Sequence, residues 1–223
     1  MRRSRTRWRR DGALLPVFLA LSLSVLPTTA TAQVMTGWSD KQQAKRLEQF
    51  ARLTPEEAAK RVITADDDLE SVATLTTDCV FKTPGGFSDR VRADNFLRAL
   101  IDKKSGRTIF QLYAQLLYTG EPRRFNAANF QLAGTIASRP LTISNGTVDC
   151  PYGVCMHEDQ IAFEVPEALL RELAARAEQR PVRPWRFRLK AQSGEDWTDD
   201  MAPAEAAGLL IAFDRYRREH GLP

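Results

Sequence analysis

The stretch from Leu69 to about Phe163 alternates apolar and polar residues with a period of two, and turn signals divide it into short runs. This pattern is typical of β-strands that bury one face. The connections are short, whereas a parallel crossover needs about a dozen residues or more, so neighbouring runs are expected to pair antiparallel. The predicted strands are Val72–Lys82, Phe96–Lys103, Thr108–Tyr118, Arg124–Gln131, Ala137–Ser144, Thr147–Cys150 and Cys155–Val165, with Trp185–Lys190 further along the chain.

Helical patterns flank this stretch on both sides. Residues 39–63 predict two short helices, the second capped by Thr54 with Pro55 at its first position. Pro166 and Pro203 each open a further predicted helix. The fold class we expect is α+β, with a meandering antiparallel β-sheet, sandwich-like or strongly curved, packed against N-terminal and C-terminal helices.

The first 32 residues have the composition of a cleavable export signal. Six arginines lie within the first ten residues, a 14-residue and mostly apolar run extends from Ala13 to Leu26, and Ala30-Thr31-Ala32 follows. The run is shorter than the roughly 18 apolar residues that a membrane span needs. We therefore predict cleavage near Ala32 and a secreted or periplasmic protein without a transmembrane span after cleavage. An uncleaved anchor is the alternative, and Arg9-Arg10 leaves a twin-arginine export route open.

Removal of this signal changes the charge of the chain. Residues 1–32 hold six of the 32 basic and one of the 28 acidic residues, so residues 33–223 carry 26 basic and 27 acidic groups. Nucleic-acid binding needs a clustered basic face, and no nucleic acid is expected as a partner of this near-neutral chain. We expect one domain, in which a helical segment, residues 33–68, packs with the sheet and C-terminal helices of residues 69–223.

Two of the three cysteines flank a short loop, Cys150-Pro151-Tyr152-Gly153-Val154-Cys155. Cysteines paired across such a turn lie close enough for a disulfide, and export to an oxidising compartment favours one, so we predict a Cys150–Cys155 disulfide. Cys79 is expected to be a buried free thiol, with pairing to one of the other cysteines or to another chain as the alternative.

This disulfide fixes a register that does not match the apolar residues well. If the two cysteines face each other, Phe163 lies opposite Thr142 while Ile143 points the other way. A bulge near Asn145-Gly146 would restore the match, and a tight hairpin turn at the same dipeptide is the alternative.

Residues around the loop also offer metal donors and acid–base groups. Cys150, Cys155 and His157, with Glu158 or Asp159, carry sulfur, nitrogen and oxygen donors, but their spacing matches no zinc site and a disulfide would consume both thiolates. We expect neither a metal nor another cofactor.

The chain has few candidates for acid–base catalysis. His220 lies three residues from the carboxyl terminus, so His157 is the candidate base, with Glu158, Asp159 and Asp196 as candidate acids. The acidic clusters, including Asp199-Asp200 before the last helix, do not fix the separations that calcium or a glycosidase needs. They are expected to occupy solvated turns and helix starts.

The function we expect is binding rather than catalysis. The second face of the predicted strand Thr108–Tyr118 is mixed, and Arg98, Tyr113 and Gln115 are its candidate ligand contacts. The leading hypothesis is a non-catalytic exported domain that binds a small molecule or an envelope protein through its sheet face. The alternative is a hydrolase-type enzyme that uses carboxylates on an extracytoplasmic substrate. A concave pocket holding one acid of raised pKa beside His157 or an arginine would favour the enzyme.

Overall fold

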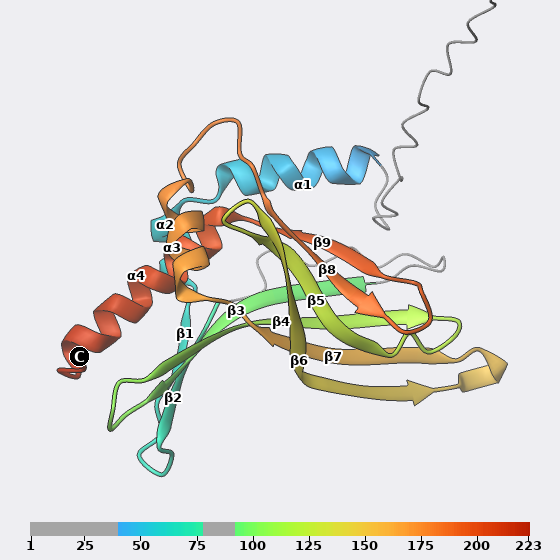
Figure 1. Ribbon diagram of the computed structural model, residues 1–223, viewed down its shortest axis with the longest axis horizontal. Helices are drawn as coiled ribbons and strands as arrows, with labels where there is room; N and C mark the ends of the chain where they lie inside the picture. The colour runs from blue at the N-terminus through green and yellow to red at the C-terminus, as the bar shows by residue number, and fades with distance from the viewer. Residues whose placement is uncertain (1–39, 78–91) are drawn as a thin grey trace, which may run out of the picture. The chain divides into compact units, whose positions relative to one another are not determined.

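The computed structural model describes residues 40–77 and 92–223, which belong to one compact unit, Val34–Pro223. This part of the chain contains α-helices and a single β-sheet (Figure 1). The helices are α1 (Asp40–Arg52), α2 (Pro55–Lys60), α3 (Glu167–Ala175) and α4 (Pro203–Glu219), with a 3₁₀ turn, η1, at Pro151–Gly153. The strands are β1 (Ile63–Ala65), β2 (Val72–Thr76), β3 (Arg92–Asp102), β4 (Thr108–Thr119), β5 (Phe125–Leu132), β6 (Thr135–Asp149), β7 (Met156–Glu164), β8 (Trp185–Ala191) and β9 (Trp197–Met201).

Every strand pair of the sheet is antiparallel, in the order β1-β2-β3-β4-β7-β6-β5-β8-β9. Strand β6 joins the two halves of the sheet, because residues 135–140 pair with β5 and residues 141–149 pair with β7. The sheet curls so that its two halves share one core: Phe163 of β7 lies 5.7 Å from Phe130 of β5 and 5.9 Å from Phe187 of β8, measured between ring centroids. The predicted antiparallel α+β fold with a strongly curved sheet is confirmed.

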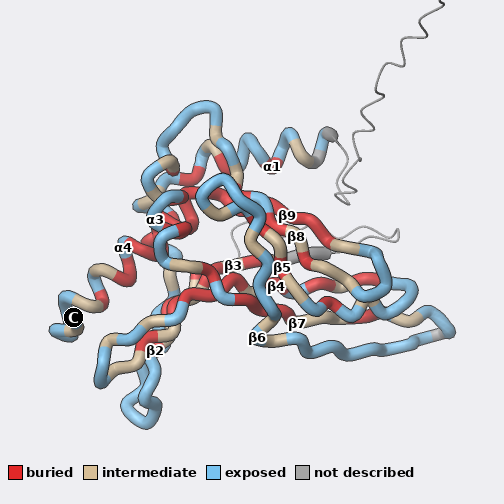
Figure 2. The backbone as a smooth tube through the Cα atoms, in the orientation of Figure 1, coloured by how far each residue is buried: buried red, intermediate tan, exposed pale blue. Residues whose placement is uncertain are grey.

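The buried residues follow the alternation of the strands (Figure 2). On β4 the inward face of Phe110, Leu112, Ala114, Leu116 and Tyr118 is buried, whereas the other face is mixed. Helix α4 packs on the inward face, where Phe213 lies 5.1 Å from Phe110. Burial of apolar side chains from strands far apart in sequence therefore holds the curl closed.

The helices begin where the sequence predicts them. Thr54 and Glu57 form the capping box of α2, and Pro203 lies at the first position of α4. Helices α1 and α2 precede the sheet and α4 follows it, but α3 lies between β7 and β8, so the helices are not confined to the two ends of the chain. None of the described helices is long and apolar enough to cross a membrane.

The sequence left the register between β6 and β7 open, and the structure shows how the two strands pair. Ser144 pairs with Ile161, as the Cys150–Cys155 disulfide requires. A bulge between Leu141 and Ile143 then places Leu141, rather than Thr142, opposite Phe163 and restores the apolar match. The strand continues in regular register through Asn145-Gly146, so the bulge lies earlier in the strand than expected, the hairpin turn considered there is wrong, and the two predicted strands are one.

Two strands were not predicted, β1 and β9. Strand β9 contains Asp199 and Asp200, which were expected in a solvated helix start. That expectation is wrong, because both aspartates are buried within the strand. The predicted strand Val72–Lys82 is present up to Thr76, and its end and Cys79 lie outside the described residues.

Candidate ligand groove

A groove of about 790 Å³ lies over β5, β8 and β9. Helix α1 contributes Gln43 and Leu47 to its lining, the β5–β6 hairpin contributes Ile136, and the segment from the end of α3 to the start of β8 contributes Arg176 and Arg183. The volume falls within the range of about 300–1,000 Å³ that is usual for small-molecule sites. We call it the arginine groove, after Arg176, Arg183, Arg186 and Arg188 in its lining.

Strand β8 supplies the groove with both apolar and charged side chains. Its alternation buries Trp185 and Phe187 and turns Arg186 and Arg188 outward, and all four residues belong to the groove lining. The ring of Trp185 packs edge-on against Phe130 of β5, with centroids 5.6 Å apart. This packing fixes the orientation of the indole.

Three buried polar atoms of residues in the groove lining have no hydrogen-bond partner among the described residues: Nε1 of Trp185, Oδ1 of Asn129 and Nε of Arg176. Trp185 is only 3% exposed, so its indole N–H is removed from bulk water. A buried polar group left without a partner costs about 1–3 kcal/mol. Groups of this kind around a groove are suited to bind a ligand that supplies the missing partners.

The arginines of the groove differ in how they are paired. Arg186 donates from Nε and Nη2 to the two carboxylate oxygens of Asp200, at 2.8 and 3.2 Å, and these hydrogen bonds raise the pKa of Arg186. Arg188 donates from Nε to Thr198 Oγ1 at 3.1 Å. No described carboxylate forms an ion pair with Arg176, Arg183 or Arg188. With Glu172 as the remaining acid of the lining, the groove has an excess of positive charge.

Helix α1, one wall of the groove, is held by charged contacts to β9. Arg46 forms an ion pair of 2.6 Å with Asp199 Oδ1 and donates from Nη2 to the backbone carbonyl of Asp200 at 2.8 Å. Gln43 donates to Asp200 Oδ2 at 3.3 Å. The second oxygen of Asp199 accepts a 2.8 Å hydrogen bond from Asn95 Nδ2 on β3. This network links α1, β3 and β9 beneath the groove.

A third buried acid, Glu205, lies next to this network at the start of α4. Burial raises the pKa of Glu205 to about 8. The backbone hydrogen bond with Ala202 and the charge of Arg46 both lower this pKa, but their effect is smaller than that of burial. Its Oε2 has no hydrogen-bond partner among the described residues. With a pKa of about 8, Glu205 is mostly protonated at pH 7. Burial also raises the pKa of Asp199, and the charge of Arg46 acts in the opposite direction.

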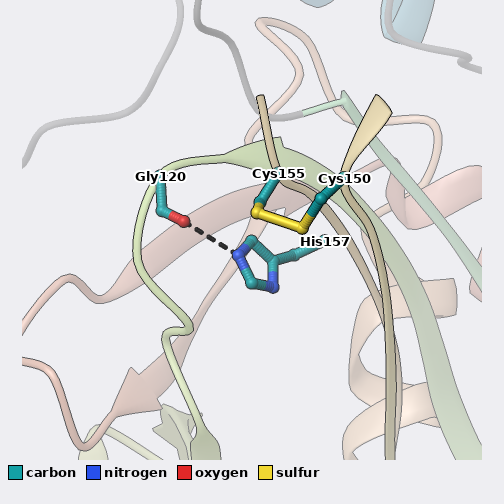
Figure 3. Close-up of a disulfide and its surroundings, with 4 residues drawn as sticks. All are labelled: Gly120, Cys150, Cys155 and His157. Atoms are coloured by element: carbon teal, nitrogen blue, oxygen red, sulfur yellow. Dashed lines mark hydrogen bonds between the residues drawn. A yellow bond between two sulfur atoms is a disulfide. The ribbon is translucent and has the colours of Figure 1, made fainter. Parts of the chain in front are cut away.

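A smaller pocket of about 370 Å³ is lined in part by β7, which contributes His157 and Asp159. His157 Nε2 lies 2.8 Å from the carbonyl oxygen of Gly120, beside the Cys150–Cys155 disulfide (Figure 3). Because a carbonyl can only accept, Nε2 carries the hydrogen and Nδ1 of the neutral ring is the acceptor. Asp159 accepts a 2.7 Å hydrogen bond from Tyr118.

The other acid candidates do not join His157 in this pocket. Glu158 points to the opposite face of β7, where it accepts a 2.6 Å hydrogen bond from Gln115. Asp196 lies before β9 and contacts Lys190 and the backbone N–H of Ala191. Burial raises the pKa of Asp196, but those two hydrogen bonds outweigh it and the net pKa is lowered.

The predicted ligand face of Arg98, Tyr113 and Gln115 is split between two sets of contacts. The guanidinium carbon of Arg98 lies 5.1 Å from the ring centroid of Tyr113, and its Nε donates to Gln111 at 2.8 Å. Burial lowers the pKa of Arg98 and raises that of Tyr113. Gln115 is exposed and is bonded to Glu158 instead.

Sequence reasoning missed the arginine groove and the acids beneath α1. The strand that begins at Trp185 was predicted, but nothing in its alternation indicates that the indole N–H lacks a partner. One signal was present for β9: Asp199-Asp200 lies between Trp197 and Met201, and such a short run bounded by apolar residues is compatible with a buried strand.

Comparison of the chain with protein-family models, curated proteins and solved structures found no match. Within residues 40–77 and 92–223, no group of three or more His, Cys, Asp or Glu side chains is arranged to hold a metal ion. The geometry of the groove and of the His157 pocket is therefore the basis for a functional assignment.

Proposed function

We propose that the protein is an exported binding domain that holds a small ligand in the arginine groove. The observation that carries this proposal is the indole N–H of Trp185, which is buried and has no partner among the described residues, in a residue that belongs to the lining of a groove of ligand size. The groove is lined by groups that bind and orient a ligand, and no histidine or cysteine is among its described lining residues.

The site of action follows from two further features. The signal-like composition of residues 1–32 and the Cys150–Cys155 disulfide both fit a secreted or periplasmic protein in an oxidising compartment. We expect residues 33–223 to be the form that binds the ligand.

Native mass spectrometry of residues 33–223 recovered from the exported fraction tests this proposal. The wild-type protein should carry a bound mass that denaturation releases. Trp185→Phe keeps the ring but removes the N–H, so it should weaken retention by roughly fivefold, the value of one hydrogen bond of about 1 kcal/mol.

Trp197→Phe is the matched control. Trp197 is equally buried and its Nε1 also lacks a partner, but it is not part of the groove lining. This variant should retain the ligand like the wild type. An exported protein without any bound mass, or equal losses in both variants, would argue against the groove as the binding site.

The His157 pocket carries a second candidate function, a hydrolase-type activity on an extracytoplasmic substrate. The supporting observation is that His157, with Nδ1 as acceptor, and Asp159 line one pocket. Hydrolysis of nitrophenyl esters and glycosides by the wild type, lost in His157→Gln and kept in Trp185→Phe, would support this candidate. Equal rates in the wild type and His157→Gln would remove it.

A further inference from the structure

We infer that the ligand of the arginine groove is an amphipathic anion, a molecule with a carboxylate head and an apolar body. This inference rests on the proposed function and adds the chemical class of the ligand. It follows from three properties of the groove: its unpaired arginines, the apolar side chains that it leaves in contact with solvent, and its tryptophan donor.

The charge of the groove selects an anion. Arg186 is neutralised by Asp200, with which it shares two hydrogen bonds, so it does not count toward the excess charge. The groove lining then has three further arginines and one further acid, Glu172, and these arginines are Arg176, Arg183 and Arg188. Arg176 follows α3 as its C-cap residue and Arg183 lies before β8, so two of these three guanidinium groups come from one short segment of chain. Guanidinium groups form their strongest hydrogen bonds with carboxylates and phosphates.

The apolar part of the groove selects a ligand with a hydrophobic body rather than a free inorganic anion. Leu47 of α1 is 37% exposed and Ile136 of β6 is 77% exposed, and both line the groove together with Val182 and Pro184. Covering such side chains with an apolar ligand gains roughly 25 cal/mol for each Å² removed from water.

The buried N–H donors favour a ligand head that accepts hydrogen bonds, such as a carboxylate, over a head that interacts through charge alone. Trp185 offers an N–H in an environment of low water content, and Arg176 Nε is a second buried donor without a partner among the described residues. A carboxylate has two oxygens that accept such hydrogen bonds, whereas a quaternary ammonium head has no acceptor and would also be repelled by the arginines.

Isothermal calorimetry with three probes tests the inference: sodium dodecanoate, dodecyltrimethylammonium and sodium acetate, each below its micelle concentration. Residues 33–223, stripped by denaturation and refolded, should bind dodecanoate at least about tenfold more tightly than the other two. The affinity for dodecanoate should fall as salt is added, because the arginines at the mouth of the groove are partly exposed.

Variants that each remove one positive charge test whether dodecanoate binds in the arginine groove. Arg183→Gln changes an exposed residue without a described partner, so it should leave folding intact and weaken dodecanoate about tenfold. Arg176→Gln should act in the same direction. The matched control is Arg215→Gln, which removes the same charge from an exposed position on α4 outside the groove and should leave the affinity unchanged.

The outcomes separate this inference from the proposed function. Equal binding of dodecanoate and dodecyltrimethylammonium, or no effect of either arginine variant, would overturn the anionic head. Equal binding of dodecanoate and acetate would overturn the apolar body. In each of these cases a ligand retained on the exported wild type and held about fivefold more weakly by Trp185→Phe would leave the proposed function standing. If Trp185→Phe retains that ligand as tightly as the wild type does, both are wrong.

Discussion

At the scale of single residues, protonation of Glu205 makes the stability of the folded state depend on pH. Its pKa in the folded protein is about 8 because the carboxyl group is buried, whereas an unfolded chain restores the ordinary value of 4.5. The folded state therefore holds the proton more tightly. The stability that this group contributes is fully present below about pH 4.5 and is lost as the pH rises through 8, by at most roughly 1.4 kcal/mol for each pH unit.

Glu205→Gln should remove that dependence. Urea unfolding at pH 5, 7 and 9 should show the variant gaining stability relative to the wild type as the pH rises. Burial raises the pKa of Asp199 in the same sense, so part of the slope should remain in the variant. Glu219→Gln, at the exposed end of the same helix, is the control. Parallel pH profiles of wild type and Glu205→Gln would contradict the assignment.

Gly208 is fixed by the close approach of α4 to α2. A Cβ atom at this position would lie 2.5 Å from Ala58 Cβ and 2.7 Å from both the carbonyl carbon of Ala58 and the backbone nitrogen of Ala59. Gly208→Ala should therefore destabilise the protein by about 1–3 kcal/mol, measured by urea unfolding. Adding Ala58→Gly should restore only part of the loss, because the backbone contacts remain. A gain in stability, as alanine gives at an unhindered helix position, would show that the helices lie further apart.

At the scale of elements, helix α1 is a wall of the groove and Arg46 is its main polar anchor. The side chains of Arg46 and Asp199 are 10% and 1% exposed, and their ion pair joins α1 to the edge strand β9. Arg46→Met leaves a buried carboxylate without its cation and should cost about 3–5 kcal/mol. Asp199→Asn in the same chain should recover much of this loss, since the buried charge is then gone.

Hydrogen exchange provides a readout for α1 itself. Amides of residues 40–52 should exchange faster in Arg46→Met and slow again in the double variant, while those of β3 and β4 change little. Uniform acceleration across all elements, or no rescue by Asp199→Asn, would indicate that Arg46 does not hold α1 through this ion pair.

The disulfide secures one turn rather than the sheet. It closes a loop of six residues, for which the chain-entropy estimate is about 2 kcal/mol. Replacing both Cys150 and Cys155 by serine should lower the unfolding free energy by that amount and leave the far-ultraviolet circular dichroism unchanged. Thiol titration of the denatured, unreduced wild type should find one thiol per chain, that of Cys79, whereas three thiols would contradict the bridge.

The sequence predicted elements well where one periodicity extended over several residues. Strands β4, β5, β7 and β8 and helix α4 begin within a residue or two of their expected positions. Strand β9 was missed because a pair of aspartates is normally solvated. Their burial is tolerable because each has a cationic partner on another element, Arg46 of α1 for Asp199 and Arg186 of β8 for Asp200. The bulge at Thr142 depends on how β6 meets β7, which local pattern does not encode.

At the scale of the whole unit, the α+β class and the antiparallel sheet could be predicted, but the groove could not. Leu47, Asn129, Arg183 and Asp200 belong to four segments far apart in sequence, which the pairing of β5, β8 and β9 and the docking of α1 on β9 bring together. Their side chains show no special pattern in their own segments. The predicted ligand contacts Arg98 and Tyr113 lie together because they are diagonal neighbours on the paired strands β3 and β4, which is a local relation.

The most direct measurement of the central claim is the indole N–H resonance of Trp185 in ¹⁵N-labelled residues 33–223, assigned by the Trp185→Phe and Trp197→Phe variants. The spectrum is recorded for protein as isolated from the exported fraction, and again after denaturation and refolding have stripped it. A ligand hydrogen-bonded to Trp185 in the arginine groove predicts that the Trp185 resonance moves between the two samples while that of Trp197 stays in place. Identical positions of the Trp185 resonance in both samples would contradict the account.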